Sequence, residues 1–104
     1  MSISFIDPPN VRHLGELASL KKAILAHFDG DSGLRFHSDE DRWRAIIHHY
    51  SPTQRGLIAG QIRELISRDD DFVLTFWNKH SDYFGFATAD EVRAYLGGKL
   101  ELFA

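Results

Sequence analysis

The sequence predicts an all-α fold, in which one small domain forms a bundle of about five helices. Three helix-start signals are the main reason, and each pairs a hydroxyl with an acid or amide three positions later. In such a capping box the hydroxyl accepts a backbone N–H of the first turn, and the second side chain reaches back to the cap. The signals lie at residues 38–41 (SDED), 51–54 (SPTQ) and 88–91 (TADE). Apolar residues at helical spacing follow each signal, and 104 residues suffice for one core.

The single domain is expected to span residues 1–104 and to open with an N-terminal arm, residues 1–9. The arm ends in two prolines, which fit the first turn of a helix because an N–H there would have no partner within the helix. The first helix is expected from about Asn10 to Phe28, since apolar residues recur there at i, i+3, i+4 and i+7.

A loop is expected over residues 29–37, because Gly30 and Gly33 interrupt the helical pattern. Leu34 and Phe36 alternate with polar residues in this loop. Both side chains could therefore return to the core.

The second helix is expected to start after Ser38 and to place Trp43 and Tyr50 on its apolar face. Arg42 and Arg44 are the two sequence neighbours of Trp43. We expect Trp43 in the core and the two arginines at the surface.

The third helix is expected to start at Pro52 and to carry an apolar stripe as far as Ile66. Gly56 and Gly60 lie within it, and each lowers its helix propensity by up to about 1 kcal/mol. We expect a neighbouring helix or an aromatic ring to pack at these two positions.

The last two helices complete the bundle. The fourth opens at the acids 69–71, which interact well with the positive end of a helix dipole, and continues to His80. The fifth is expected from Ala89 to about Leu102. The linker at residues 81–86 contains three aromatic residues, so at least one ring is expected to point inward.

Composition narrows the possible partners. The net charge is −3, and a protein that binds nucleic acid directly needs a basic face, so no such partner is expected. No apolar run approaches the roughly 18 residues of a membrane span, and the N-terminus lacks the basic start and apolar run of a signal peptide. No membrane partner is therefore expected. The absence of cysteine favours a reducing, cytoplasmic location.

Catalytic and metal-binding motifs are not evident. Six histidines are present, but their spacing matches no zinc signature, and the adjacent His48 and His49 would point about 100° apart on a helix. No nucleophile elbow occurs, and the acids lie in polar runs typical of solvated positions. We therefore expect no enzyme activity, no metal site and no cofactor.

The acids are the remaining feature of interest, and two interpretations of them stay open. Five acids lie within 13 residues, namely Asp29, Asp31, Asp39, Glu40 and Asp41. Residues 69–71 form a second group, and Asp82 lies beyond the fourth helix. One interpretation assigns them to helix caps and dipole partners on a solvated surface. The other assigns them to an acidic face for a basic protein, because complementary charge speeds association.

Four features follow one another from Leu20 onward. The first is an amphipathic helix that runs into an aromatic–acid turn (24–31, ILAHFDGD), and the second is a short acidic helix (38–50). The third is a helix with the motif RGLIAGQIRELI (55–66). The fourth is an aromatic turn (83–86, YFGF) before a terminal helix (92–96, VRAYL). In this order the chain resembles a family of small immunity proteins from bacterial contact-dependent growth inhibition systems.

The resemblance implies a cytoplasmic antidote that binds and neutralises the toxic C-terminal domain of a cell-surface effector. Many such toxins are nucleases, which need basic surfaces to hold phosphate, so an acidic inhibitor would mimic the charge of their substrate. The residues expected to bind the toxin are Asp29, Asp31, Asp39, Glu40, Asp41, Asp69, Asp71, Asp82 and Tyr83.

Two alternative functions remain open, as does the oligomeric state. The first alternative is a general protein-interaction or regulatory domain that has no toxin partner. The second is a small metal-dependent enzyme that uses acids 69–71 together with His37, His48, His49 or His80.

Overall fold

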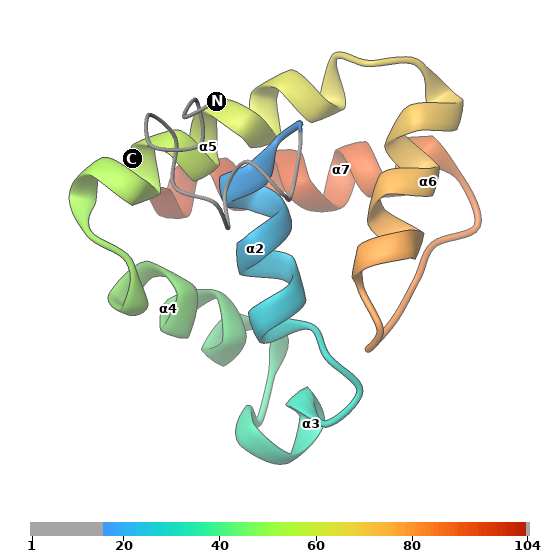
Figure 1. The fold of residues 1–104 in the computed structure, drawn as a ribbon. Coiled ribbons are helices and arrows are strands. Elements are labelled where there is room, and N and C mark those ends of the chain that lie inside the picture. The colour runs from blue at the N-terminus through green and yellow to red at the C-terminus, as the bar shows by residue number, and fades with distance from the viewer. Residues whose placement is uncertain (1–15, 104) are drawn as a thin grey trace, which may run out of the picture.

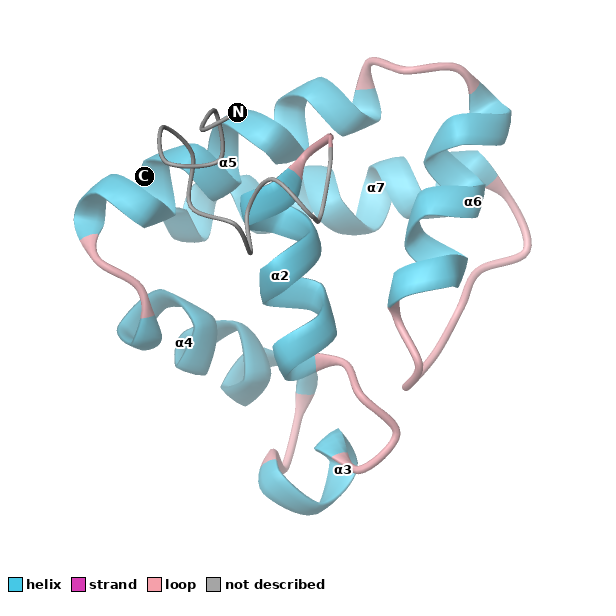
Figure 2. Ribbon diagram, viewed as in Figure 1, coloured by secondary structure: helices cyan, strands magenta, loops and turns pink. Residues whose placement is uncertain are grey.

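The computed structural model describes residues 16–103 and shows an all-α arrangement (Figure 1). Its helices, in chain order, are α2 (Ala18–His27), α3 (Ser32–Arg35), α4 (Asp39–His49), α5 (Pro52–Ile66), α6 (Asp70–His80), α7 (Ala89–Lys99) and the 3₁₀ helix η2 (Leu100–Phe103). Figure 2 shows no strand among the described residues, which confirms the predicted fold class. The predicted arm at residues 1–9 and the predicted helix start at Asn10 lie outside the described part of the chain.

The three predicted helix-start signals all act as caps. The Ser38 hydroxyl accepts the N–H of Asp41 at the start of α4. At α5 and α7 the full capping box forms, with Ser51 and Thr88 as caps, and the side chain of the third residue of each helix accepts the backbone N–H of its cap. These starts depend on local hydrogen bonds alone, so the sequence located them correctly.

The helix predicted from Asn10 to Phe28 is interrupted at Leu17. Leu17 has a left-handed backbone (φ 56°, ψ 39°), and α2 starts at Ala18, so the predicted continuous helix is wrong at this position. The left-handed region costs a residue with a Cβ roughly 1–2 kcal/mol. Leu17 is only 5% exposed, and burial of a leucine side chain is worth about 1.5–3 kcal/mol, which offsets that cost.

Two tryptophans and a phenylalanine form the centre of the core. The ring of Phe28 lies 5.6 Å from that of Trp43 and 5.0 Å from that of Trp77, and all three side chains are almost fully buried. In the surrounding bundle α2 packs mainly on α5, and α6 on α7 (Figure 1). Phe84 and Phe86 of the linker after α6 contact Trp77, so the expected inward ring is confirmed.

Three further expectations are wrong. Leu34 does not return to the core but is 88% exposed, and the predicted loop contains α3, since residues 32–35 close one helical turn. A Cβ at Gly56 or Gly60 would meet nothing within 4 Å, so no neighbour among residues 16–103 packs at either position. Phe36, by contrast, is half-buried.

Candidate functional site

Segments far apart in the sequence meet at one end of the molecule. The carbonyl of Phe28 accepts the backbone N–H groups of both Asp82 and Tyr83, each over 2.8 Å. This contact ties the α6–α7 connection to the C-terminal end of α2, and Figure 1 shows both on the side of the molecule that carries α3. Tyr83 also lines a pocket together with Asp39, which joins the first turn of α4 to the same end.

Seven of the nine predicted site residues therefore belong to one region, which we call the acidic end. It comprises Asp29, Asp31, Asp39, Glu40, Asp41, Asp82 and Tyr83. The other two predicted residues lie elsewhere. Asp69 is the N-cap of α6 and Asp71 lies in its first turn, whereas Asp82 follows its C-terminal end. Eleven helical residues rise about 16 Å, so the structure does not bring Asp69 and Asp71 to the acidic end.

Arg42 is the buried centre of the acidic end and is only 2% exposed. Its Nε donates to the carbonyl of His27 over 3.1 Å, and a terminal nitrogen donates to the hydroxyl of Ser32 over 3.2 Å. The expected surface position of Arg42 is therefore wrong, whereas Arg44 is exposed as expected. The reason is tertiary: the ends of α2 and α3 present acceptors that a guanidinium on α4 can satisfy.

Aromatic rings surround the same guanidinium. Its carbon lies 4.4 Å from the ring centroid of Tyr83, 5.0 Å from that of Phe28 and 5.5 Å from that of Phe36. Such cation–π contacts are worth more when the cation is desolvated, as it is here. Gly33 allows the Tyr83 ring to approach, since a Cβ at that glycine would lie 2.9 Å from the Tyr83 hydroxyl. Tyr83 is thus held in place while remaining 43% exposed.

Asp39 is a hub of internal interactions. Its Oδ1 accepts the Tyr95 hydroxyl over 2.6 Å, and that hydroxyl in turn accepts the indole N–H of Trp43 over 2.8 Å. The ammonium of Lys99 lies 2.9 Å from Oδ2. Burial, followed by the bond to Asp39, raises the pKa of Tyr95 above its usual range. These bonds give Asp39 a structural role, joining α4 to α7.

Three other carboxylates also have partners within the chain. Asp29 and Arg35 form an ion pair of 2.5 Å, and the Arg35 hydrogen bond lowers the pKa of Asp29 to about 2. Glu40 and Asp41 both face Arg44, at 2.7 and 3.8 Å. These pairs screen much of the charge that the sequence places in this region.

Asp31 and Asp82 differ from these paired acids. Both are exposed, and neither side chain forms an ion pair or hydrogen bond with another residue of the described chain. Asp31 lies two residues before Gly33, which the Tyr83 ring approaches, and Asp82 precedes Tyr83 in the chain. The two carboxylates at the acidic end that form no ion pair within the described chain therefore lie close in sequence to the residues of this contact.

A pocket of about 370 Å³ opens at the acidic end, and we call it the Tyr83 pocket. Aromatic rings and the paired Asp39 and Arg42 make up most of its wall. Its lining residues are Phe36, His37, Ser38, Asp39, Arg42, Tyr83, Phe84, Phe86 and Tyr95. The pocket therefore offers mainly aromatic surface, with Asp39 and Arg42 already paired within the chain.

Sequence reasoning missed Leu34 as a surface residue. It lies on α3 between Asp31 and Arg35, and it is the most exposed of the large apolar side chains that the structure describes. The residues three and four positions from Leu34 are Gly30, Asp31, His37 and Ser38. The absence of an apolar residue among them is the sequence signal that would have indicated an exposed position.

Other kinds of site find little support within residues 16–103. No group of three or more histidine, cysteine or acidic side chains there is arranged to hold a metal ion. No helix in the same range has the length and apolar character needed to cross a membrane. Comparison with protein-family models, with curated proteins and with solved structures finds no match for this chain.

Proposed function

We propose that this chain is an immunity protein that binds and neutralises the C-terminal toxin domain of a contact-dependent growth inhibition effector. The observation that supports this most directly is the convergence of three separate segments at the acidic end. There Asp31 and Asp82, which form no ion pair within the described chain, lie close in sequence to the contact between Tyr83 and Gly33.

The chemistry of the acidic end suits a basic protein surface. An aromatic ring that is held in place and partly exposed is typical of an interface hot spot, because little side-chain entropy is lost on binding. Leu34, on α3 next to Gly33, adds exposed apolar surface at the acidic end. A standard complex buries about 800 Å² on each partner, which would extend over α3 and the neighbouring first turn of α4.

The carboxylates of the acidic end would also steer a basic toxin toward this surface. Complementary charge raises association rates by 10- to 1000-fold and loses this effect as salt screens it. A nuclease toxin holds phosphate with lysine and arginine, so its active site would attract the carboxylates of the acidic end. Under this proposal Asp31 and Asp82 guide the encounter, and Tyr83 and Leu34 hold the complex.

A charge-reversal experiment tests the proposal. The double variant Asp31→Lys/Asp82→Lys is compared with Glu64→Lys/Glu101→Lys, which changes the net charge equally at exposed positions outside the acidic end. Each is produced beside the cognate toxin domain that this proposal requires. We expect the first pair to slow association about ten-fold at low salt and to restore growth inhibition. Equal behaviour of the two pairs would contradict an acidic-end interface.

A further inference from the structure

The wall of the Tyr83 pocket is built from aromatic rings of three separate segments. Phe36 precedes α4, three rings lie in the connection between α6 and α7, and Tyr95 lies on α7. Phe84 makes edge-to-face contacts with three of the other rings. Its centroid lies 5.9 Å from that of Tyr83, 5.5 Å from that of Phe86 and 5.6 Å from that of Tyr95. A further ring that enters the pocket could continue this edge-to-face packing.

The charged groups of the wall already satisfy one another. Asp39 is the only acid among the lining residues, and its carboxylate accepts the Tyr95 hydroxyl over 2.6 Å. The same carboxylate pairs with Arg42 at 3.3 Å and with Lys99 at 2.9 Å. A lysine or arginine side chain in the pocket would therefore add a third cation beside one carboxylate. A neutral occupant avoids that repulsion.

His37 provides a polar group that has no partner yet. It lines the pocket, it is exposed, and its ring forms no hydrogen bond within residues 16–103. A neutral imidazole has one nitrogen that can accept a hydrogen bond. The occupant that suits both the ring wall and His37 is an aromatic group with a donor at its tip, such as a phenol or an indole.

We propose that the Tyr83 pocket receives one tyrosine or tryptophan side chain of the cognate toxin domain. This inference rests on the proposed immunity function and names the kind of residue that the toxin inserts. The volume of about 370 Å³ is at the small end of known ligand sites, which suits a single side chain. Tyrosine and tryptophan are also enriched among the hot-spot residues of protein interfaces.

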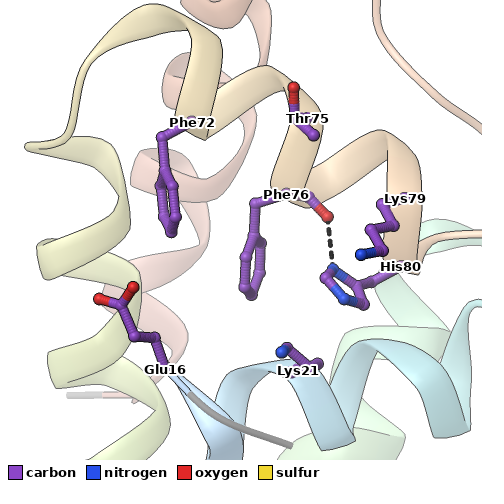
Figure 3. A pocket seen from close by; sticks show the side chains of 7 residues that line it. All are labelled: Glu16, Lys21, Phe72, Thr75, Phe76, Lys79 and His80. Carbon is purple, nitrogen blue, oxygen red and sulfur yellow. Dashed lines mark hydrogen bonds between the residues drawn. The ribbon is translucent and has the colours of Figure 1, made fainter.

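A second pocket, of about 250 Å³, offers an internal comparison. Figure 3 shows Phe72 and Phe76 of α6 in this pocket, with ionisable side chains around them. The guanidinium of Arg68 already covers the ring of Phe72 at 3.9 Å. A neutral aromatic group therefore finds fewer open rings here than in the Tyr83 pocket.

The first test uses the full chain and p-cresol, which is the side chain of tyrosine without its backbone. Its counterpart 4-methylcyclohexanol has a similar outline but no aromatic ring, and n-propylguanidinium carries the head group of arginine. NMR titrations follow the ring signals of the residues that line the two pockets. We expect saturable shifts in the Tyr83 pocket with p-cresol, which should bind about two- to ten-fold more tightly than 4-methylcyclohexanol. The guanidinium compound should not shift the pocket rings.

Two variants at exposed histidines test the role of His37. His37→Ala should weaken binding of p-cresol by about two- to ten-fold, because the phenol loses its acceptor. His48→Ala, outside the pocket, should leave that binding unchanged. Equal effects of the two variants, equal affinity for p-cresol and 4-methylcyclohexanol, or shifts centred on Phe72 and Phe76 would each overturn the proposal.

Competition separates this inference from the proposed function. The cognate toxin domain is titrated into the labelled chain with and without p-cresol at a concentration that fills the pocket, and 4-methylcyclohexanol at the same concentration is the control. We expect p-cresol to weaken toxin binding more than the control does. Toxin binding at the acidic end that p-cresol leaves unchanged would overturn the aromatic anchor alone. Absence of toxin binding would overturn the proposed function as well.

Discussion

Replacement of the buried Arg42 by methionine should destabilise the protein strongly. Methionine keeps an unbranched apolar side chain but removes the guanidinium and its hydrogen bonds. The His27 carbonyl and the Ser32 hydroxyl would lose their donors, and Ser32 is fully buried. A buried polar group left without a partner costs about 1–3 kcal/mol.

The magnitude follows from adding these effects. Two unpaired groups at about 1–2 kcal/mol each, plus the lost contacts with the rings of Tyr83, Phe28 and Phe36, give about 3–4 kcal/mol. Asp39 limits the damage, because Tyr95 and Lys99 still satisfy it. A domain of this size has a total stability of roughly 5–15 kcal/mol, so the loss is a large fraction of it.

Urea denaturation measures the effect. With a slope of about 1–1.5 kcal/mol/M, the midpoint should fall by about 2–4 M. Arg44→Met is the matched control, since Arg44 is exposed and pairs only on the surface, and it should cost less than about 1 kcal/mol. Similar losses in the two variants, or a loss below 1 kcal/mol for Arg42→Met, would refute the central role of Arg42.

Three further predictions concern stability. Burial lowers the pKa of His27, so the unfolded state binds more protons than the folded state once the pH falls below 6.5. The contribution of neutral His27 to the free energy of unfolding should therefore be complete above that pH and be lost as the pH falls through the lowered pKa. A urea midpoint that rises from pH 7 to pH 5 would disprove this. Gly60→Ala should stabilise α5 by about 0.5–1 kcal/mol, because a Cβ there meets no described atom within 4 Å. Gly33→Ala would crowd the Tyr83 hydroxyl and should give no such gain when the two variants are compared in thermal melts. Tyr95→Phe should cost about 2 kcal/mol, because the indole N–H of Trp43 loses its acceptor; an unchanged urea midpoint would show that this bond contributes nothing.

The features that the sequence predicted correctly are those with local causes. The starts of α4, α5 and α7 each depend on a hydroxyl and a backbone N–H three positions apart, and the stripes that follow depend on helical spacing. The inward rings of Phe84 and Phe86 were also foreseeable, because an exposed aromatic linker would leave too much apolar surface in water.

The features that it missed have tertiary causes. Leu17 adopts a left-handed backbone because its side chain is buried, and Arg42 is buried because α2 and α3 present acceptors to it. No residue close in sequence to Leu17 indicates its left-handed backbone, and none close to Arg42 indicates its burial. The acids were visible in the sequence, but their pairing with Arg35, Arg44 and Lys99 was not.

The candidate site was therefore predicted only in part. The sequence indicated the acids and Tyr83, and the structure groups seven of the nine residues while separating Asp69 and Asp71 from them. It also shows that Asp31 and Asp82 lack the ion pairs that the other acids of the acidic end form within the described chain. Leu34, expected in the core, joins them at the surface.

Mapping of the binding surface tests the proposed function most directly. The isotopically labelled full chain is titrated with a catalytically inactive form of the cognate toxin domain that the proposal requires, and amide shifts are followed by NMR. We expect tight binding, with the largest shifts in residues 29–41 and 81–84 and with an association rate that falls as salt rises. Absence of binding, or shifts concentrated around Asp69 and Asp71 at the other end of α6, would contradict the proposal.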